Sequence, residues 1–309
     1  MNRDSLPPAV AFPPKHLLVA VDFSPCSAGA SRVALRLARI FGAKISFVHV
    51  LAPVAEDPEV VLNWGDFPAR RRAVAEARLQ QWSAEQAAGM LARTVVLEGR
   101  PCACLLELAA ATESALLLAG RRGWTSGLDG ERLGSRVLRL LRHAGCPVWV
   151  ADEDEPGVDE PQKALLLATD YSPAAEVAVP VAVTLAEVLG VRLIVANAQE
   201  AMALPGQREY TRHEAEIEAR REQAAAELEV WRADRLGVLM DSAAESLEGT
   251  PARALCRAAA RLQVGLIVLA SRGRTNWLQA LLGGTAERVA GHAPCAVLVV
   301  PAAAESAEE

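Results

Sequence analysis

The first half of this 309-residue chain is repeated, motif by motif, in its second half. LLVAVDFSP at 17–25 matches LLLATDYSP at 165–173, an offset of 148 residues. Three further pairs keep nearly the same offset and the same order: ISFVHV at 45–50 with LIVANA at 193–198, EGRP at 98–101 with EGTP at 248–251, and HAGCPVWV at 143–150 with HAPCAVLVV at 292–300. An internal repeat of this length indicates a duplicated domain.

The repeat also predicts the domain boundaries. We expect an N-terminal extension at 1–14, a first domain at 15–152, an acidic, proline-bearing linker at 153–162, a second domain at 163–301 and a disordered tail at 302–309. Two domains of this size can each bury a core of their own.

Within each copy, short apolar runs alternate with stretches of helical period. The runs lie at 16–22, 44–50, 91–98, 115–120 and 147–151, and again at 164–170, 192–198, 237–243, 265–271 and 296–300. Continuous apolar runs suit parallel strands that are covered on both faces. The pattern predicts an α/β protein: two tandem doubly wound domains, each a five-stranded parallel sheet flanked by helices.

The first helix of each copy carries its own start and stop signals. Ser24 can cap the helix, Pro25 suits its first position, and Gly42 ends it. The second copy repeats this pattern with Ser172, Pro173 and Gly190.

Composition narrows the possible partners and locations. The net charge of −6 would repel a phosphate backbone, which disfavours nucleic acid. No segment has the apolar length of a signal peptide or a membrane-spanning helix, so we expect no membrane association and a cytoplasmic location.

The sequence lacks the signatures of several common catalytic and metal sites. The six cysteines show no paired CxxC spacing, which gives no indication of zinc or of a disulfide framework. The histidines show no metal-ligand spacing, and His143 and His292 occupy matching places that indicate helix ends. No Walker A loop and no G-x-G-x-x-G after a first strand are present. We assign no catalytic residue and no metal ligand.

Candidate binding residues cluster where strands end, because an open parallel sheet binds ligands beyond its carboxyl edge. Asp22 and Asp170 end the first strand of each copy. Each could tighten the following turn by bonding backbone amides, or could bond a ribose or adenine group.

Two glycine elements of each copy should reach the same edge. The first holds Gly120 and Gly123, matched by Ala270 and Gly273, and the second holds Gly134 and Ser135, matched by Gly283, Gly284 and Thr285. Glycines let backbone amides approach phosphate, and a helix N-terminus favours an anion. The alternatives are ordinary turns and an ordinary helix start.

Taken together, these motifs resemble the universal stress protein family over about residues 15–300, through VAVDFSP, GRRG, ERLGS and HAGCPVWV in the first copy and ATDYSP, ASRGRTN, LLGGTAERV and HAPCAVLVV in the second. ATP-binding members of that family carry G-x2-G-x9-G-[S/T] after the fourth strand. The first copy has ten residues between Gly123 and Gly134, including Asp129 and Glu131. The second copy keeps nine, but has Ala270 for the first glycine and Gly284 at the hydroxyl position, with Thr285 following.

The resemblance implies further contacts. Val50 and Ala198 fall where a backbone contact to adenine would occur, Thr169 lies beside Asp170, and Arg121, Arg122, Arg272 and Arg274 flank the phosphate region. Alternatively, Val50 and Ala198 serve only to pack the strand ends, and the arginines are ordinary solvated surface residues. Because its spacing is intact, the second copy is the favoured site.

The implied function is stress-response regulation through a bound adenine nucleotide, ATP or else AMP or ADP, with or without Mg²⁺, and with at most slow hydrolysis. Two alternatives remain: a nucleotide-free dimerisation or scaffold module, and an enzyme handling adenylates. The resemblance also implies pairing of the last strands, PVWVAD and CAVLVVP, between the domains and association into a homodimer.

Overall fold

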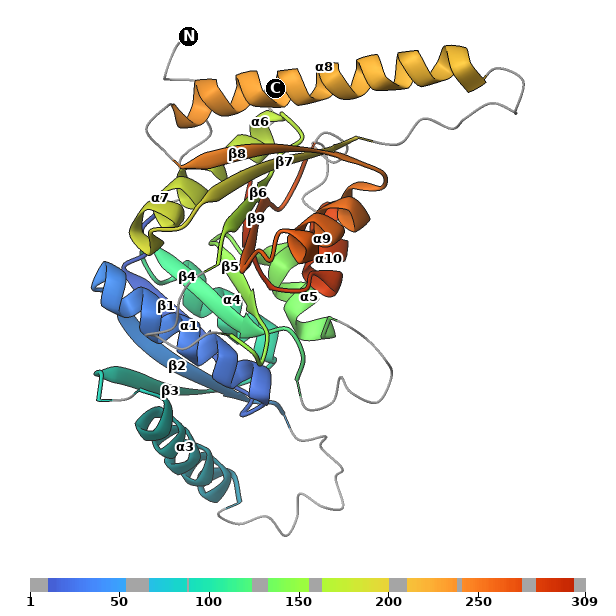
Figure 1. Cartoon of the computed structure of the whole chain (residues 1–309). Coiled ribbons are helices and arrows are strands. Elements are labelled where there is room, and N and C mark those ends of the chain that lie inside the picture. Colours follow the sequence, from blue (N-terminus) through green and yellow to red (C-terminus); the bar gives the residue numbers. More distant parts are fainter. Residues whose placement is uncertain are drawn as a thin grey trace, which may run out of the picture. The chain divides into compact units, whose positions relative to one another are not determined.

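The computed structural model describes residues 11–53, 67–87, 89–123, 133–155, 163–199, 210–237, 241–273 and 282–302. The chain divides into two compact units (Figure 1). The described residues between 11 and 155 form the N-terminal unit, and those between 163 and 302 form the C-terminal unit.

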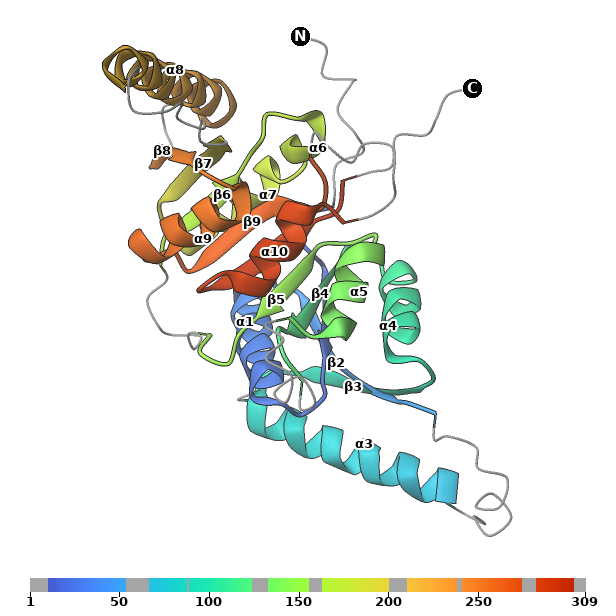
Figure 2. The ribbon, with the colours of Figure 1, turned by 90° about the vertical axis from the view of Figure 1, so that its right-hand side faces the viewer.

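The N-terminal unit is a five-stranded parallel sheet with the strand order β3-β2-β1-β4-β5. Helices α1 and α3 cover one face, and α4 and α5 cover the other (Figure 2). In chain order the elements are β1 His16–Ala20, α1 Pro25–Phe41, β2 Lys44–Leu51, α3 Phe67–Gln86, β3 Ala92–Glu98, α4 Pro101–Ala110, β4 Ala115–Gly120, α5 Ser135–His143 and β5 Val148–Ala151.

The C-terminal unit repeats this topology with the order β8-β7-β6-β9-β10, again parallel. Its elements are β6 Leu165–Ala168, α6 Pro173–Glu176, α7 Val179–Leu189, β7 Leu193–Gln199, α8 Tyr210–Leu236, β8 Ser242–Glu248, α9 Pro251–Arg261, β9 Leu266–Ala270, α10 Gly284–His292 and β10 Ala296–Val300. The predicted fold class, two tandem doubly wound domains with five parallel strands each, is confirmed.

Strands β4, β9 and β10 are almost entirely buried, as their apolar runs predict. Leu116, Leu117 and Leu118 of β4 are at most 1% exposed, and all residues of β9 and β10 are buried. A strand covered by helices on both faces needs no polar side, which explains the missing alternation.

Helix α1 begins and ends where the sequence predicts. The Ser24 side chain accepts a hydrogen bond from the Ser27 amide, and Pro25 is the first helical residue. Gly42 ends the helix in the left-handed conformation at φ 65°, which glycine adopts without steric cost. His143 and His292 are the last residues of α5 and α10, as expected.

The equivalent helix of the second copy differs from the prediction of one continuous helix ending at Gly190. It is split into α6 and α7 by a turn at residues 177–178. Pro180 stands in the first turn of α7. Proline has no amide hydrogen for the preceding turn, and its ring clashes with the carbonyl four residues earlier, so a continuous helix is broken there.

The predicted strand at 237–243 is misplaced. The structure places β8 at Ser242–Glu248, and Gly237 has φ 70° directly after α8. The prediction rested on the apolar residues of GVLM at 237–240, whereas this edge strand is half-exposed and carries no apolar run. The 150-residue offset of EGRP and EGTP, applied to β3, gives the correct position.

None of the helices in the described part of the chain combines the length and the apolar character that crossing a membrane requires.

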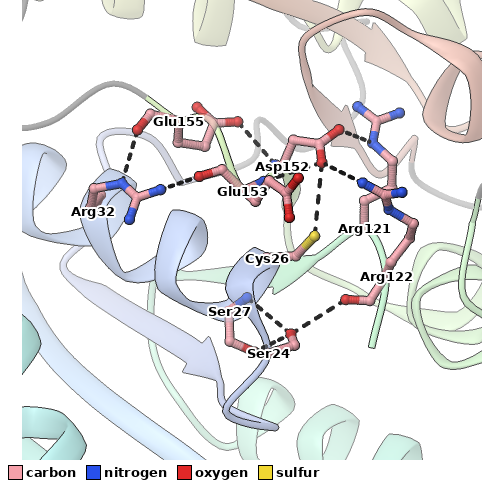
Figure 3. Close-up of polar contacts among 9 residues, drawn as sticks. All are labelled: Ser24, Cys26, Ser27, Arg32, Arg121, Arg122, Asp152, Glu153 and Glu155. Atoms are coloured by element: carbon pink, nitrogen blue, oxygen red, sulfur yellow. Dashed lines mark hydrogen bonds and ion pairs between the residues drawn. The ribbon is translucent and has the colours of Figure 1, made fainter. Parts of the chain in front are cut away.

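Residues 152–155, which follow β5, pack against α1 (Figure 3). Arg32 of α1 donates hydrogen bonds to the carbonyl oxygens of Glu153 and Glu155. A Cβ atom at Gly29 would overlap the carbonyl oxygen of Asp152, so glycine lets this backbone lie directly on the helix. Sequence analysis assigned Glu153 and Glu155 to the linker, yet both contact the helix.

The Glu155 carboxyl is buried in this contact and accepts a hydrogen bond from the Asp152 amide at 3.2 Å. Burial raises its pKa from the ordinary 4.5 to about 7, against the opposing effects of the Asp152 amide and the Arg36 charge. The folded state therefore holds this proton more tightly than the unfolded state. The resulting stabilisation is complete below about pH 4.5 and is lost as the pH rises through about 7.

The Glu155→Gln variant should remove this pH dependence, because its amide stays neutral. From pH 5 to pH 8, the unfolding free energy of the wild type should fall relative to that of the variant by about 2–3 kcal/mol. Urea titrations at both pH values measure the difference. Asp154→Asn, at a neighbouring exposed carboxylate, is the control and should track the wild type. An equal fall in the wild type and in Glu155→Gln would contradict the assignment.

Candidate functional site

Each unit has a cavity at the carboxyl edge of its sheet, where the direction of winding reverses between β1 and β4 or between β6 and β9. The N-terminal cavity has a volume of about 130 Å³, and the C-terminal cavity about 200 Å³. Every predicted site residue of the first copy lines the first cavity: Asp22, Val50, Gly120, Gly123, Gly134 and Ser135. Those of the second copy line the second cavity: Thr169, Asp170, Ala198, Ala270, Arg272, Gly273, Gly283, Gly284 and Thr285.

The aspartate of each copy holds the turn into the first helix. Asp22 Oδ1 accepts hydrogen bonds from the Ser24 amide at 3.0 Å and from Ser27 Oγ at 2.5 Å. Asp170 Oδ1 accepts from the Ser172 amide at 3.0 Å and from Ser172 Oγ at 2.6 Å. The turn-forming role that the sequence left open is therefore present in both copies.

The residue after each aspartate has a left-handed backbone. Phe23 has φ 64° and Tyr171 has φ 62°. Such a conformation is unfavourable for a bulky side chain and persists only where its surroundings enforce it. Phe23 packs against His49 and Trp82, with ring centroids 4.7 and 5.6 Å away, and these contacts hold the turn in place.

The second carboxylate oxygen of each aspartate faces the glycine after β4 or β9. A Cβ atom at Gly123 would lie 2.6 Å from Asp22 Oδ2, and one at Gly273 would overlap Asp170 Oδ2. Only glycine fits at these positions while the carboxylate keeps its place. Each aspartate therefore uses one oxygen for the turn and directs the other toward the glycine loop.

Gly120 has a packing role that sequence analysis did not foresee. A Cβ atom there would lie 2.7 Å from Cys26 Cβ and 3.0 Å from the Ser27 amide nitrogen. Glycine at this position lets β4 approach the first turn of α1. This contact explains Gly120 without a ligand.

The helices α5 and α10 begin at the cavities. Gly134 and Gly283 are their N-caps, and neither has a side chain that could bond the first-turn amides. The Gly134 amide donates to the Arg121 carbonyl at 2.9 Å, and the Gly283 amide donates to the Ser271 carbonyl at 2.7 Å, which fixes both helix starts. The first helical residues line the cavities, so each cavity faces the positive end of a helix dipole.

Sequence analysis missed a side chain that holds the end of the first strand. His49 Nδ1 lies 2.7 Å from the Val21 carbonyl oxygen, and Asn197 Nδ2 donates to the Thr169 carbonyl at 2.8 Å. A carbonyl can only accept, so Nδ1 of His49 carries the proton. The shared offset of 148 between ISFVHV and LIVANA was the signal that could have identified this pair.

His49 also lines the N-terminal cavity. Its burial lowers the pKa of the imidazole, and the nearby charges of Arg78 and Arg71 act in the same direction, against the Val21 carbonyl and Asp22. The folded protein therefore favours the neutral imidazole more than the unfolded chain does.

The arginines near the two cavities differ in whether they line the cavity. Arg272 lines the C-terminal cavity. Arg121 and Arg122 form ion pairs with Asp152 instead, at 3.1 and 3.5 Å (Figure 3), and neither lines the N-terminal cavity. Arg136 of α5, which sequence analysis did not single out, does line it. Asp129, Glu131 and Arg274 lie outside the described residues.

Within the part of the chain that the structure describes, no three His, Cys, Asp or Glu side chains are grouped so that they could hold a metal ion.

Fold and cavities together define a tandem doubly wound α/β protein, and comparison with known proteins places it more closely. The universal stress protein family matches residues 14–152 and 162–301. A universal stress protein of Mycolicibacterium smegmatis is 32% identical over 297 residues, covering 92% of this chain and 96% of the relative. One from Mycobacterium tuberculosis is 26% identical over 294 residues, with coverages of 92% and 95%. The crystal structure of a universal stress protein from Archaeoglobus fulgidus matches with a TM-score of 0.64 at 17% identity, covering 94% of this chain and 100% of that chain. The chain belongs to the universal stress protein family.

The Gly123→Ala substitution should destabilise the N-terminal unit by about 1–2 kcal/mol, because the Asp22 carboxylate must give up its turn hydrogen bonds to make room. Urea unfolding measures this cost. In an Asp22→Ala background the same substitution should cost less, and this coupling identifies the carboxylate as the cause. Gly284→Ala is the control, since a Cβ there meets nothing within 4 Å. Equal costs in both backgrounds would contradict the proposed contact.

Proposed function

We propose that this chain is a regulatory protein of the stress response that binds an adenine nucleotide, ATP or else AMP or ADP, in its C-terminal cavity, and that it acts by binding rather than by turnover. One observation carries the proposal. The N-terminus of α10, capped by a glycine, lines the same cavity as Arg272 and Asp170.

The phosphates are assigned to the helix end. The first-turn amides of α10 and the Thr285 hydroxyl are hydrogen-bond donors suited to phosphate oxygens, and Arg272 supplies a positive charge. Gly284 leaves open space beside them. Mg²⁺ accompanies the phosphates in this proposal, because it binds to nucleotide phosphates and retains several of its waters.

The nucleoside is assigned to the opposite side of the cavity. Asp170 lies at the end of β6 and can accept a hydrogen bond from a ribose hydroxyl, while Ala198 at the end of β7 offers backbone groups to the adenine ring. The small side chains Ala168 and Ala196 leave room between the two strand ends. These assignments follow the predicted roles of the site residues.

The nucleotide-free scaffold remains the second candidate, and one feature of the N-terminal unit favours it there. Packing against Cys26 alone accounts for Gly120, the last residue of β4, whereas the second copy has Ala270 at this position. Homodimerisation is part of both proposals, and light scattering of the purified chain tests it.

Blocking each cavity in turn tests the nucleotide proposal. Gly284→Phe should place a large side chain in the C-terminal cavity and weaken ATP binding at least about tenfold, because the phenyl ring occupies the phosphate region. Ser135→Phe makes the matched change at the start of α5 and should leave this binding intact. Calorimetric titration with ATP measures both variants. The proposal fails if the wild type binds no ATP at millimolar concentration, or if Gly284→Phe binds it as tightly as the wild type.

A further inference from the structure

The two copies differ at the position where the last strand meets the glycine loop. The backbone is equivalent: the Arg121 amide donates to the Ala151 carbonyl, and the Ser271 amide donates to the Val300 carbonyl, both at 2.7 Å. The side chains are not equivalent. The first copy continues with Asp152, whereas the second continues with Pro301 and Ala302.

The matching arginine also lies differently in the two copies. Arg122 and Arg272 occupy the same place in GRRG and ASRG. Arg122 pairs with Asp152 Oδ1 at 3.5 Å, and this carboxylate is the foremost cause that raises the pKa of Arg122. Among the described residues no carboxylate forms an ion pair with Arg272, which lines its cavity.

Asp152 is the anchored member of the pair. Its amide donates to Glu155 Oε1 at 3.2 Å, and its carbonyl lies on Gly29 of α1. Arg121, 3% exposed, approaches its second carboxylate oxygen at 3.1 Å. Arg122 is the more exposed partner, with 46% of its side chain exposed against 31% for Asp152.

Resting on the proposed function, we propose that Asp152 sets the affinity of the N-terminal cavity for phosphorylated ligands by holding Arg122 away from it. The carboxylate competes with phosphate for the same guanidinium and adds a negative charge beside the glycine loop. Arg136 stays in the lining of the N-terminal cavity, so Asp152 weakens this cavity as an anion site by withholding a second arginine. No described carboxylate withholds Arg272 from the C-terminal cavity in this way.

The test removes the charge of Asp152 and measures only the N-terminal cavity. In a Gly284→Phe background, Asp152→Asn should tighten ATP binding about threefold to tenfold in calorimetric titration, the range expected when a half-exposed ion pair is released. Asp154→Asn makes the same change in net charge two residues away and should leave the affinity unchanged. Adding Ser135→Phe should abolish the gain.

A second variant guards against a folding defect, because Asp152→Asn takes a charged partner from the buried Arg121. The double variant Arg121→Ser/Asp152→Ala gives the first copy the small, uncharged pattern of the second, and should show the same gain. Conversely, Pro301→Asp should weaken ATP binding at the C-terminal cavity.

The outcomes separate this inference from the proposed function. If the wild type binds ATP at the C-terminal cavity but neither Asp152 variant binds it more tightly than Gly284→Phe alone, the inference is wrong and the proposed function stands. An equal gain from Asp154→Asn would also overturn it, since net charge alone would then be the cause. If no variant binds ATP, both proposals fall together.

Discussion

The turn after the first strand of each unit determines the geometry of everything around the cavity. Its aspartate carboxylate bonds the start of the first helix with one oxygen and directs the other toward the glycine loop. His49 or Asn197 bonds the carbonyl of the residue before that aspartate. The residue after the aspartate has a left-handed backbone conformation. Strand end, helix start and loop therefore meet at a single carboxylate in each copy. A ligand would contact a preorganised edge, and binding would require little rearrangement.

Much of this arrangement was predictable because it is local or repeated. Ser24, Pro25 and Gly42 act on their own helix, so their roles follow from residue type and position. The aspartates and the first glycine element of each copy were found because they stand at or just after the end of an apolar run, and parallel strands bring such ends to one edge. The second glycine element was found because it opens a predicted helix. The duplication gave each assignment an independent second instance.

The errors arose where the pattern was not local. Strand β8 lies at an edge and has few apolar residues, so its burial depends on α8 and β7 rather than on its own sequence. The pairing of Arg121 and Arg122 with Asp152 joins residues 30 or 31 positions apart, and the choice between carboxylate and cavity is made by side-chain conformation. The sequence shows that the arginines flank the loop, but not which way they point.

Because the domain is duplicated, the two cavities of this chain can be compared with each other. Both units keep the sheet order, the turn and the helix start, so we expect any difference in ligand affinity to come from the side chains that differ around the two cavities. Where the first copy has His49, the second has Asn197, and both side chains bond the carbonyl before the aspartate. Where the first copy has Asp152, the second has Pro301 and therefore no charge. A charge close to an anion site changes affinity more than a neutral replacement does, because phosphate carries the charge that it acts on. If both cavities bind the nucleotide as proposed, the carboxylate after β5 is one difference through which two copies of one fold would hold it with unequal strength.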